Sequence, residues 1–320
     1  MKKDTLDLPQ LIISALSAVS IAVIVFIFVF VFYRAMPVFS ANGADYFFKG
    51  GFDVQINEAF YSSDAEPALT FGMLGLISGT VVTTFLALLI ASLVGIGSAI
   101  TICEFSSPRI SAILIAVVRI FAAVPSVVFG LIGLITVVPF VEKLFVTTEM
   151  QIQYLTVFQM TGRNMLSAVI VLAVMIVPTI ITLSVDALNS VPQALKETGY
   201  AFGMTKFRVI YKIMLPCARS GILAGIILGA GRGIGEAIAI SMVCGGLGII
   251  PDAKLGLINF LAPTLPLASA IVNKSEAMGS FAVESALFSC GATLLIIGTA
   301  LSIFAKFVEK RLRKRDGHDD

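Results

Sequence analysis

A chain of 320 residues that is 58% hydrophobic and 13% charged is not an ordinary soluble protein, in which about a quarter of residues are charged. The net charge of +2 carries no indication of nucleic-acid binding, and the single histidine, His318, excludes His-based catalysis and His-ligated metals. The composition predicts an all-α, polytopic membrane protein with no catalytic residues, no metal and no other cofactor.

The first predicted span is the apolar run 11–33, which can cross about 30 Å of hydrocarbon at about 1.5 Å per residue. A signal peptide would have a shorter apolar region of about 7–15 residues and a small-residue cleavage site, whereas Tyr33 and Arg34 follow this run. We therefore expect a retained span, followed by an acidic and aromatic external loop to residue 67.

Five further spans are expected in chain order. They are 69–102, 110–140 (interrupted by Pro125 and Pro139), 165–188 (with Pro178 as a kink point), 221–243 and 282–304. The long loop 244–281 is rich in proline and small residues and has room for a re-entrant or interfacial helix.

Basic residues predict the orientation of these spans. The ends and loops on one side carry 14 of the 22 Lys and Arg residues: Lys2, Lys3, Arg109, Lys196, Lys206, Arg208, Lys212, Arg219, Lys306, Lys310, Arg311, Arg313, Lys314 and Arg315. Cationic loops stay in the cytoplasm, so both termini are expected to be cytoplasmic. The basic cluster in 306–315 is expected to lie against membrane lipid rather than nucleic acid.

The longest cytoplasmic loop, residues 189–220, is polar and basic. Val191-Pro192 favours a helix start, because proline is tolerated in the first helical turn. Gly203 interrupts the pattern before an amphipathic run that ends at Pro216. The segment predicts two short helices around a turn; the simplest alternative is an interfacial loop attracted to anionic lipid.

Five residues of this loop have a fixed spacing: Glu197, Gly203, Ile213, Leu215 and Pro216. The spacing resembles the EAA loop of ATP-binding-cassette (ABC) import permeases, although Thr198 and Gly199 replace its two alanines with other small residues. In that family the loop forms coupling helices that seat in a cleft of the ATPase subunit. Glycine at position 203 suits the tight reversal of the backbone that such a hairpin needs.

The resemblance extends over about residues 79–306. Two segments resemble the phosphate-import (Pst) permeases: RIFAAVPSVVFGLIGL (119–134) and LGAGRGIGEAIAI (228–240). The GRxxGE motif and the long first external loop are closer to the PstC-like than to the PstA-like subunits. Arg119 departs from the family, in which an acidic residue is common there. This arginine is expected to snorkel toward the cytoplasm or to pair with a neighbour such as Glu104.

The resemblance implies a type I ABC importer permease (MetI-like) fold with six transmembrane helices. The domains are then 1–68 (tail, first helix and external loop), 69–308 (the importer transmembrane domain, with its coupling loop at 189–220) and 309–320 (a basic cytoplasmic tail). It further implies a bacterial or archaeal plasma membrane location and a transport subunit that is not an enzyme. The implied partners are a homologous PstA-like permease subunit, two ATP-binding subunits and an external phosphate-binding protein.

Arg232 and Glu236 are four residues apart in predicted span 221–243, so on one helix they share a face and can pair. Charges at mid-bilayer cost from about 3 to more than about 10 kcal/mol and normally face a cavity or a partner. One interpretation is a structural ion pair or a subunit contact. The other interpretation, which the resemblance supports, is that the guanidinium of Arg232 binds a tetrahedral oxyanion. Glu236 would then hold Arg232 in place, or gate release of the anion by competing with it for Arg232.

Gly229, Gly231, Gly233 and Gly235 recur at every second residue, which is not the GxGxxG spacing of a dinucleotide site. They are expected to permit close helix packing or to let backbone approach the substrate. Gly233 and Gly235 are therefore candidate pathway residues beside Arg232 and Glu236. Since no GxxxxGK[ST] motif is present, ATP must bind to a partner subunit.

Alternatives remain open at this stage. Arginine suits sulfate, molybdate or phosphonate as well as phosphate, so the choice of anion depends on the resemblance. A stand-alone secondary transporter or channel would predict inverted repeats, and the basic loop would be unexplained. A membrane enzyme lacks a nucleophile–base or metal constellation, and a scaffold without transport leaves the intramembrane charges unexplained.

Overall fold

The structure is a computed structural model, and it describes residues 8–62 and 67–315. Within those residues the chain forms helices joined by turns and loops, and the single β-type contact is an isolated bridge between Gly245 and Thr264. The expected all-α fold class is confirmed. The predicted basic N-terminal tail before residue 8 lies outside the described residues, as does the C-terminal stretch after residue 315 that contains the histidine.

Six helical stretches within the described ranges are long and apolar enough to cross a membrane, as the sequence predicts. They are α1 (Leu8–Asn42); α4 (Leu74–Ile100) continued by the π-helical segment η1 (Thr101–Phe105); α6 (Ser126–Ile132), η2 (Gly133–Val137) and α7 (Val138–Phe145); α9 (Met165–Asn189); α11 (Lys206–Val209), η3 (Ile210–Met214) and α12 (Leu215–Gly235); and α15 (Phe281–Arg315). The predicted span 165–188 matches α9 to one residue. Helices α1 and α15 extend well beyond the predicted spans 11–33 and 282–304, because an apolar run marks the part inside hydrocarbon and the helix continues past it.

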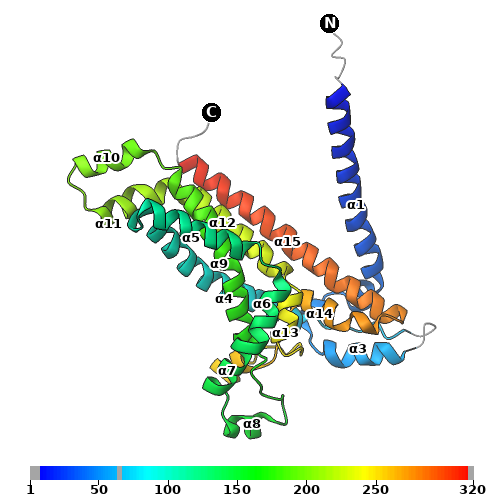
Figure 1. The fold of residues 1–320 in the computed structure, drawn as a ribbon. Coiled ribbons are helices and arrows are strands. Elements are labelled where there is room, and N and C mark those ends of the chain that lie inside the picture. The colour runs from blue at the N-terminus through cyan, green and yellow to red at the C-terminus, as the bar shows by residue number, and fades with distance from the viewer. Residues whose placement is uncertain (1–7, 63–66, 316–320) are drawn as a thin grey trace.

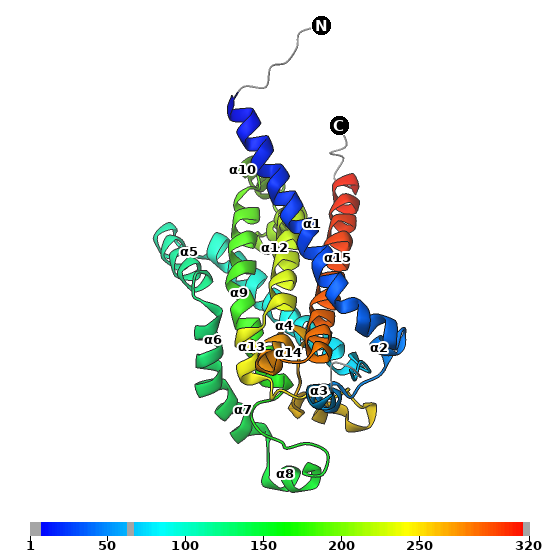
Figure 2. The same ribbon diagram turned by 90° about the vertical axis from the view of Figure 1, so that its right-hand side faces the viewer.

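The start of α1, the end of α15 and helix α10 (Gln193–Ala201) all lie toward the same end of the molecule in both views (Figures 1 and 2). The opposite end carries α3 (Phe52–Tyr61), α7 and α8 (Thr148–Tyr154). The first residues of α1 and the last residues of α15 are thus on the side of the basic loop, as an even number of spans requires.

The segment predicted to be the first external loop is more structured than a loop. Besides α3 it contains α2 (Asp45–Phe48), where the Tyr46 hydroxyl hydrogen-bonds Thr293 Oγ1 of α15 at 2.8 Å. Asp53 Oδ2 of α3 accepts from the backbone N of Gly248 at 2.6 Å. These contacts fix α2 and α3 on the helix bundle.

The predicted third span, 110–140, is wrong in its first half. Residues Pro108–Ala122 form a separate helix, α5, with no buried residue, and the membrane-spanning stretch begins at Ser126. Pro125 explains the break, because proline disfavours helical backbone at the residue before it. Figure 2 shows α5 projecting to the side of α9, with α6 continuing at an angle.

Helix α9 is the centre of the packing. In the apolar 18-residue segment of α9, 67% of the residues are buried inside the protein, whereas none are buried in the corresponding segment of α1. Helix α9 packs against both α4 and α12. The helix continues through Pro178, whose carbonyl accepts a hydrogen bond from Thr182 Oγ1 at 2.9 Å.

Glycines let α12 approach α9 and α4 closely. They recur every fourth residue along one face: Gly221, Gly225, Gly229 and Gly233. A methyl group added to Gly229 would lie 2.8 Å from Ile176 Cγ2 of α9, whereas one added to Gly231 meets nothing within 4 Å. This four-residue spacing is the small-residue pattern of packed membrane helices.

Replacing Gly229 with valine is expected to destabilise the folded protein by about 1–3 kcal/mol, the usual cost of forcing extra carbon atoms into a packed interface. The measurement is the thermal unfolding midpoint of the purified protein in detergent. Gly231→Val is the matched control, since its side chain enters open space. Equal midpoints for the two variants would contradict the packing role.

Candidate translocation and coupling sites

The predicted span that carries Arg232 is broken near its C-terminal end. Helix α12 ends at Gly235, Glu236 has an extended backbone with ψ of 113°, and the chain becomes helical again in α13 (Ile238–Val243). The predicted unbroken span 221–243 is therefore wrong here. The glycine-rich sequence favours the break, because glycine costs about 1 kcal/mol of helix stability relative to alanine.

Glu236 stabilises the break. Its Oε1 accepts a hydrogen bond from the backbone N of Ala239 at 3.0 Å and so satisfies a free N–H at the start of α13.

The break is also contacted by the loop 244–281. The carbonyl oxygen of Ala237 accepts from Ser269 Oγ at 3.1 Å. That serine belongs to α14 (Leu267–Lys274), whose first four residues are buried. The loop 244–281 thus contains a helix packed into the bundle, at a place where the sequence left room for a re-entrant helix.

Arg232 and Glu236 do not form the ion pair that their spacing allows, and that one of the two interpretations assigned to them. Glu236 lies beyond the helix end, and a separation of four residues no longer places it on the face of Arg232. Arg232 Nη1 instead donates to Thr179 Oγ1 of α9 at 3.3 Å. None of the ion pairs recorded for residues 8–62 and 67–315 includes Arg232.

Arg232 borders a pocket of about 800 Å³. The polar side chains of its lining come from Thr179, Arg232, Thr299 and Ser302, and the rest of the lining is apolar or glycine. The guanidinium is half-buried there beside a neutral hydroxyl, without a carboxylate of the described chain to neutralise it. A cation in such a place attracts an anion, and the planar fork of arginine fits an oxyanion.

The two candidate glycines lie in different surroundings. Gly233 is buried, and a methyl group on it would lie 3.0 Å from Thr84 Cγ2 of α4. Gly235 is exposed and has nothing within 4 Å of such a methyl group. Close packing therefore explains Gly233, while the open space at Gly235 is compatible with approach of a substrate or subunit to the backbone.

The basic loop forms a helical hairpin. Helix α10 ends at Ala201, and Gly203 has a φ of +73°, the left-handed conformation that glycine adopts without strain. The backbone N of Gly203 donates to Tyr200 O at 2.9 Å, and that of Met204 donates to Gly199 O at 3.1 Å. This is the Schellman pattern of helix termination, and it confirms the predicted pair of short helices around Gly203.

The remaining residues of the EAA-like spacing belong to the same hairpin. A methyl group on buried Gly199 would lie 2.6 Å from Ile213 Cδ1 in η3, so these two positions pack directly together. Leu215 and Pro216 are the first residues of α12 and follow directly on the π-helical turn η3. Glu197 is exposed on α10 and is available to a partner.

A sequence model of the family described as "Binding-protein-dependent transport system inner membrane component" matches residues 91–314. These residues include the hairpin, α12 with Arg232 and the break that follows it. The chain belongs to this family. It is therefore an inner-membrane permease subunit of an ABC importer.

Relatives of this permease include phosphate transporters. It is 33% identical over 268 residues to the phosphate transport system permease protein PstC of Xylella fastidiosa (strain 9a5c), which covers 81% of this chain and 80% of the relative. It is 31% identical over 256 residues to PstC of Pasteurella multocida, with 78% of each chain covered. A probable ABC transporter permease protein, YqgH of Bacillus subtilis, is 29% identical over 302 residues, covering 94% and 90%.

Solved structures support the MetI-like importer fold of this permease. A chain of a bacterial alginate ABC transporter, in complex with an alginate-bound periplasmic protein, superimposes with a TM-score of 0.55 at 15% identity, covering 94% of this chain and 95% of that one. A chain of the inward-facing MetNI methionine ABC transporter gives 0.51 at 16% identity, covering 73% and 93%.

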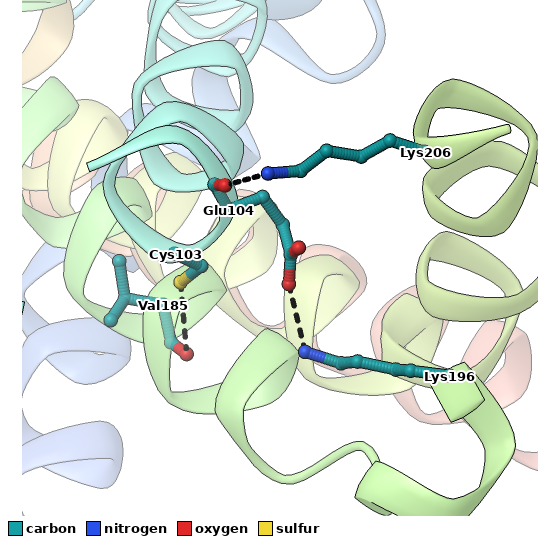
Figure 3. Close-up of polar contacts among 5 residues, drawn as sticks. All are labelled: Cys103, Glu104, Val185, Lys196 and Lys206. Atoms are coloured by element: carbon teal, nitrogen blue, oxygen red, sulfur yellow. Dashed lines mark hydrogen bonds and ion pairs between the residues drawn. The ribbon is translucent and has the colours of Figure 1, made fainter. Parts of the chain in front are cut away.

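The sequence did not reveal the partners of Glu104. Its Oε1 pairs with Lys196 Nζ of α10 at 2.8 Å, not with Arg119 (Figure 3). Arg119 is exposed on α5 and borders a small cavity together with Asp186 of α9. A glutamate at the end of a span and lysines in the basic loop were visible in the sequence, but nothing in their spacing linked them.

Proposed function

We propose that this permease forms half of the translocation pathway of an ATP-driven inorganic phosphate importer. The observation that carries the proposal is Arg232, a half-buried cation beside a pocket in the membrane-spanning part, with a hydroxyl as its only recorded partner in the described chain. Phosphate is favoured among oxyanions because PstC proteins are among the relatives. Glu236 acts here by holding the helix break beside Arg232, and the backbone at Gly235 remains open to the anion.

The hairpin around Gly203 is the proposed docking site for an ATPase subunit. Its exposed aromatic side chains include Phe202, Phe207 and Tyr211, which are 79%, 70% and 73% exposed. Exposed aromatic residues at a helical hairpin, here around the turn and the first residues of the Lys206–Gly235 stretch, are typical of a protein–protein interface. The hairpin side, with both chain ends, is then cytoplasmic, in agreement with the distribution of basic residues.

The full assembly would contain a PstA-like second permease subunit, two ATP-binding subunits and an external phosphate-binding protein. Residues 69–308 form the transport domain, residues 1–68 add α1 and the outer helices, and residues 309–320 form the basic tail. Alternating exposure of Arg232 to the outside and to the cytoplasm would move the anion, as rigid-body motion follows ATP-driven closure of the ATPases.

Uptake of labelled phosphate tests the function in cells that lack this chain and are complemented with it. Complementation is expected to restore uptake, and unlabelled sulfate and molybdate in excess are expected to leave it unchanged. Competition by either anion would assign the permease to another oxyanion while preserving the architecture. Absence of any restored uptake would contradict phosphate import.

A further inference from the structure

We propose that Glu104 is a positioning residue that fastens both helices of the cytoplasmic hairpin to the end of α4, so that motion of the hairpin is delivered to α4. The inference builds on the proposed function, in which the hairpin receives motion from an ATPase. It concerns residues outside the EAA-like spacing, because Glu104 lies in η1 about 90 residues earlier in the chain.

The first fastening point is an ion pair. Lys196 Nζ of α10 lies 2.8 Å from Glu104 Oε1, and the two side chains are only 15% and 11% exposed (Figure 3). A charge-assisted hydrogen bond shielded from water is stronger and more directional than a surface pair. Removing one partner leaves the other charge buried without compensation.

The second fastening point comes from the other helix of the hairpin. Lys206 Nζ of α11 donates to the backbone carbonyl oxygen of the same Glu104 (Figure 3). The ammonium also lies 4.6 Å from the ring centroid of Phe105, a cation–π distance, and Phe105 contacts Phe207 with ring centroids 5.8 Å apart. Lysines from both sides of the Gly203 turn therefore converge on one residue of η1.

Helix α4 connects this clamp to the opposite end of the permease. Its 27 residues span about 40 Å at 1.5 Å per residue. Near the outer end, Thr80 Oγ1 accepts from the backbone N of Leu267 at the start of α14, at 2.9 Å. Between the two ends, Thr84 lies against Gly233, next to Arg232. Helix α4 with its continuation η1 thus contacts the hairpin through Glu104, the vicinity of the proposed anion site through Thr84, and α14 through Thr80.

A clamp that only stabilised the hairpin would predict loss of the hairpin's fold and of ATPase docking when it is removed. A clamp that transmits motion predicts a different result: the hairpin still docks and ATP is still hydrolysed, but transport becomes inefficient. Residues along a coupling network change the coupling by a moderate factor without contacting either ligand. The two roles can therefore be separated by measurement.

The test uses the full complex with its ATPases and external binding protein, reconstituted in vesicles. Glu104→Gln is expected to lower the labelled phosphate imported per ATP hydrolysed on the order of tenfold. Co-purification of the ATPases and the rate of ATP hydrolysis should remain near the wild-type values. Glu309→Gln, which alters an exposed glutamate at the cytoplasmic end of α15, is the matched control and should behave as wild type.

A double-mutant cycle identifies the partner. Lys196→Met alone should reproduce the defect, and the double variant should be no worse than the more defective single variant, because both changes remove one interaction. Unchanged coupling in Glu104→Gln, loss of ATPase co-purification, or multiplicative defects in the double variant would each overturn the proposal.

A distance measurement separates this proposal from the proposed function. Spin labels at Ser107 and Ala194, both exposed, report the distance between the end of α4 and α10 in lipid nanodiscs without any transported anion. Glu104→Gln should broaden the distance distribution, and an unchanged distribution would overturn the clamp. Failure of the wild-type complex to import phosphate would instead overturn the proposed function and leave this distance result standing.

Discussion

Arg232→Ala is expected to abolish phosphate uptake while leaving the permease folded and assembled. A charge-assisted contact to a desolvated anion accounts for about 2–5 kcal/mol, so transport should fall at least about thirtyfold. The fold should persist because the guanidinium supports only one recorded hydrogen bond, to Thr179, and does not complete an ion pair within the described chain. The measurement is initial uptake of labelled phosphate, normalised to permease in the membrane.

Two further variants define the role of that charge. Arg232→Lys should retain a small part of the uptake, since the positive charge remains but the planar fork is lost. Arg311→Ala removes an exposed arginine that contacts Phe307 at the cytoplasmic end of α15, and it should transport normally. Full uptake by Arg232→Ala would reduce Arg232 to a structural residue.

Gly203→Val is expected to uncouple the permease from its ATPases. A β-branched side chain at a φ of +73° is strained by about 1–2 kcal/mol or more, and the hairpin should rearrange to relieve the strain. A methyl group at this position meets nothing within 4 Å, so the effect would come from backbone conformation and not from a clash. Co-purification of the ATPases and ATP-dependent uptake should both fall at least about tenfold.

Gly203→Asn is the matched variant, because asparagine tolerates the left-handed conformation. It should dock the ATPases and transport close to the wild-type level. If valine and asparagine were equally active, the turn geometry would be irrelevant to docking. If both were equally inactive, the surface at Gly203, rather than its backbone, would be the important feature.

Hydrophobic length predicted the spans well where a helix is simple. The predicted bounds of α9 were correct to one residue. An apolar run of this length between polar segments can cross a bilayer only as a single helix, so the ends of the run mark the ends of the helix. Gly203 was also predictable, since an isolated glycine between two amphipathic patterns signals a turn that needs positive φ.

The features that failed depend on contacts between distant segments. The break at Glu236 needs a capping bond to Ala239 and a contact from Ser269 on α14, neither of which is visible in local sequence. Helix α5 was assigned to a span because its composition is apolar, although the proline that separates it from α6 was visible. The Glu104 clamp joins residues about 90 positions apart, and residue spacing carries no information on such pairs.

The most direct test of the central claim is accumulation of labelled phosphate by vesicles that contain the purified complex of this chain, its partner permease and two ATPases. The account predicts that phosphate accumulates against its gradient only when both ATP and the external binding protein are supplied. Phosphate movement without ATP would indicate a secondary transporter or channel. ATP-driven accumulation of sulfate or molybdate, with none of phosphate, would contradict the proposed substrate.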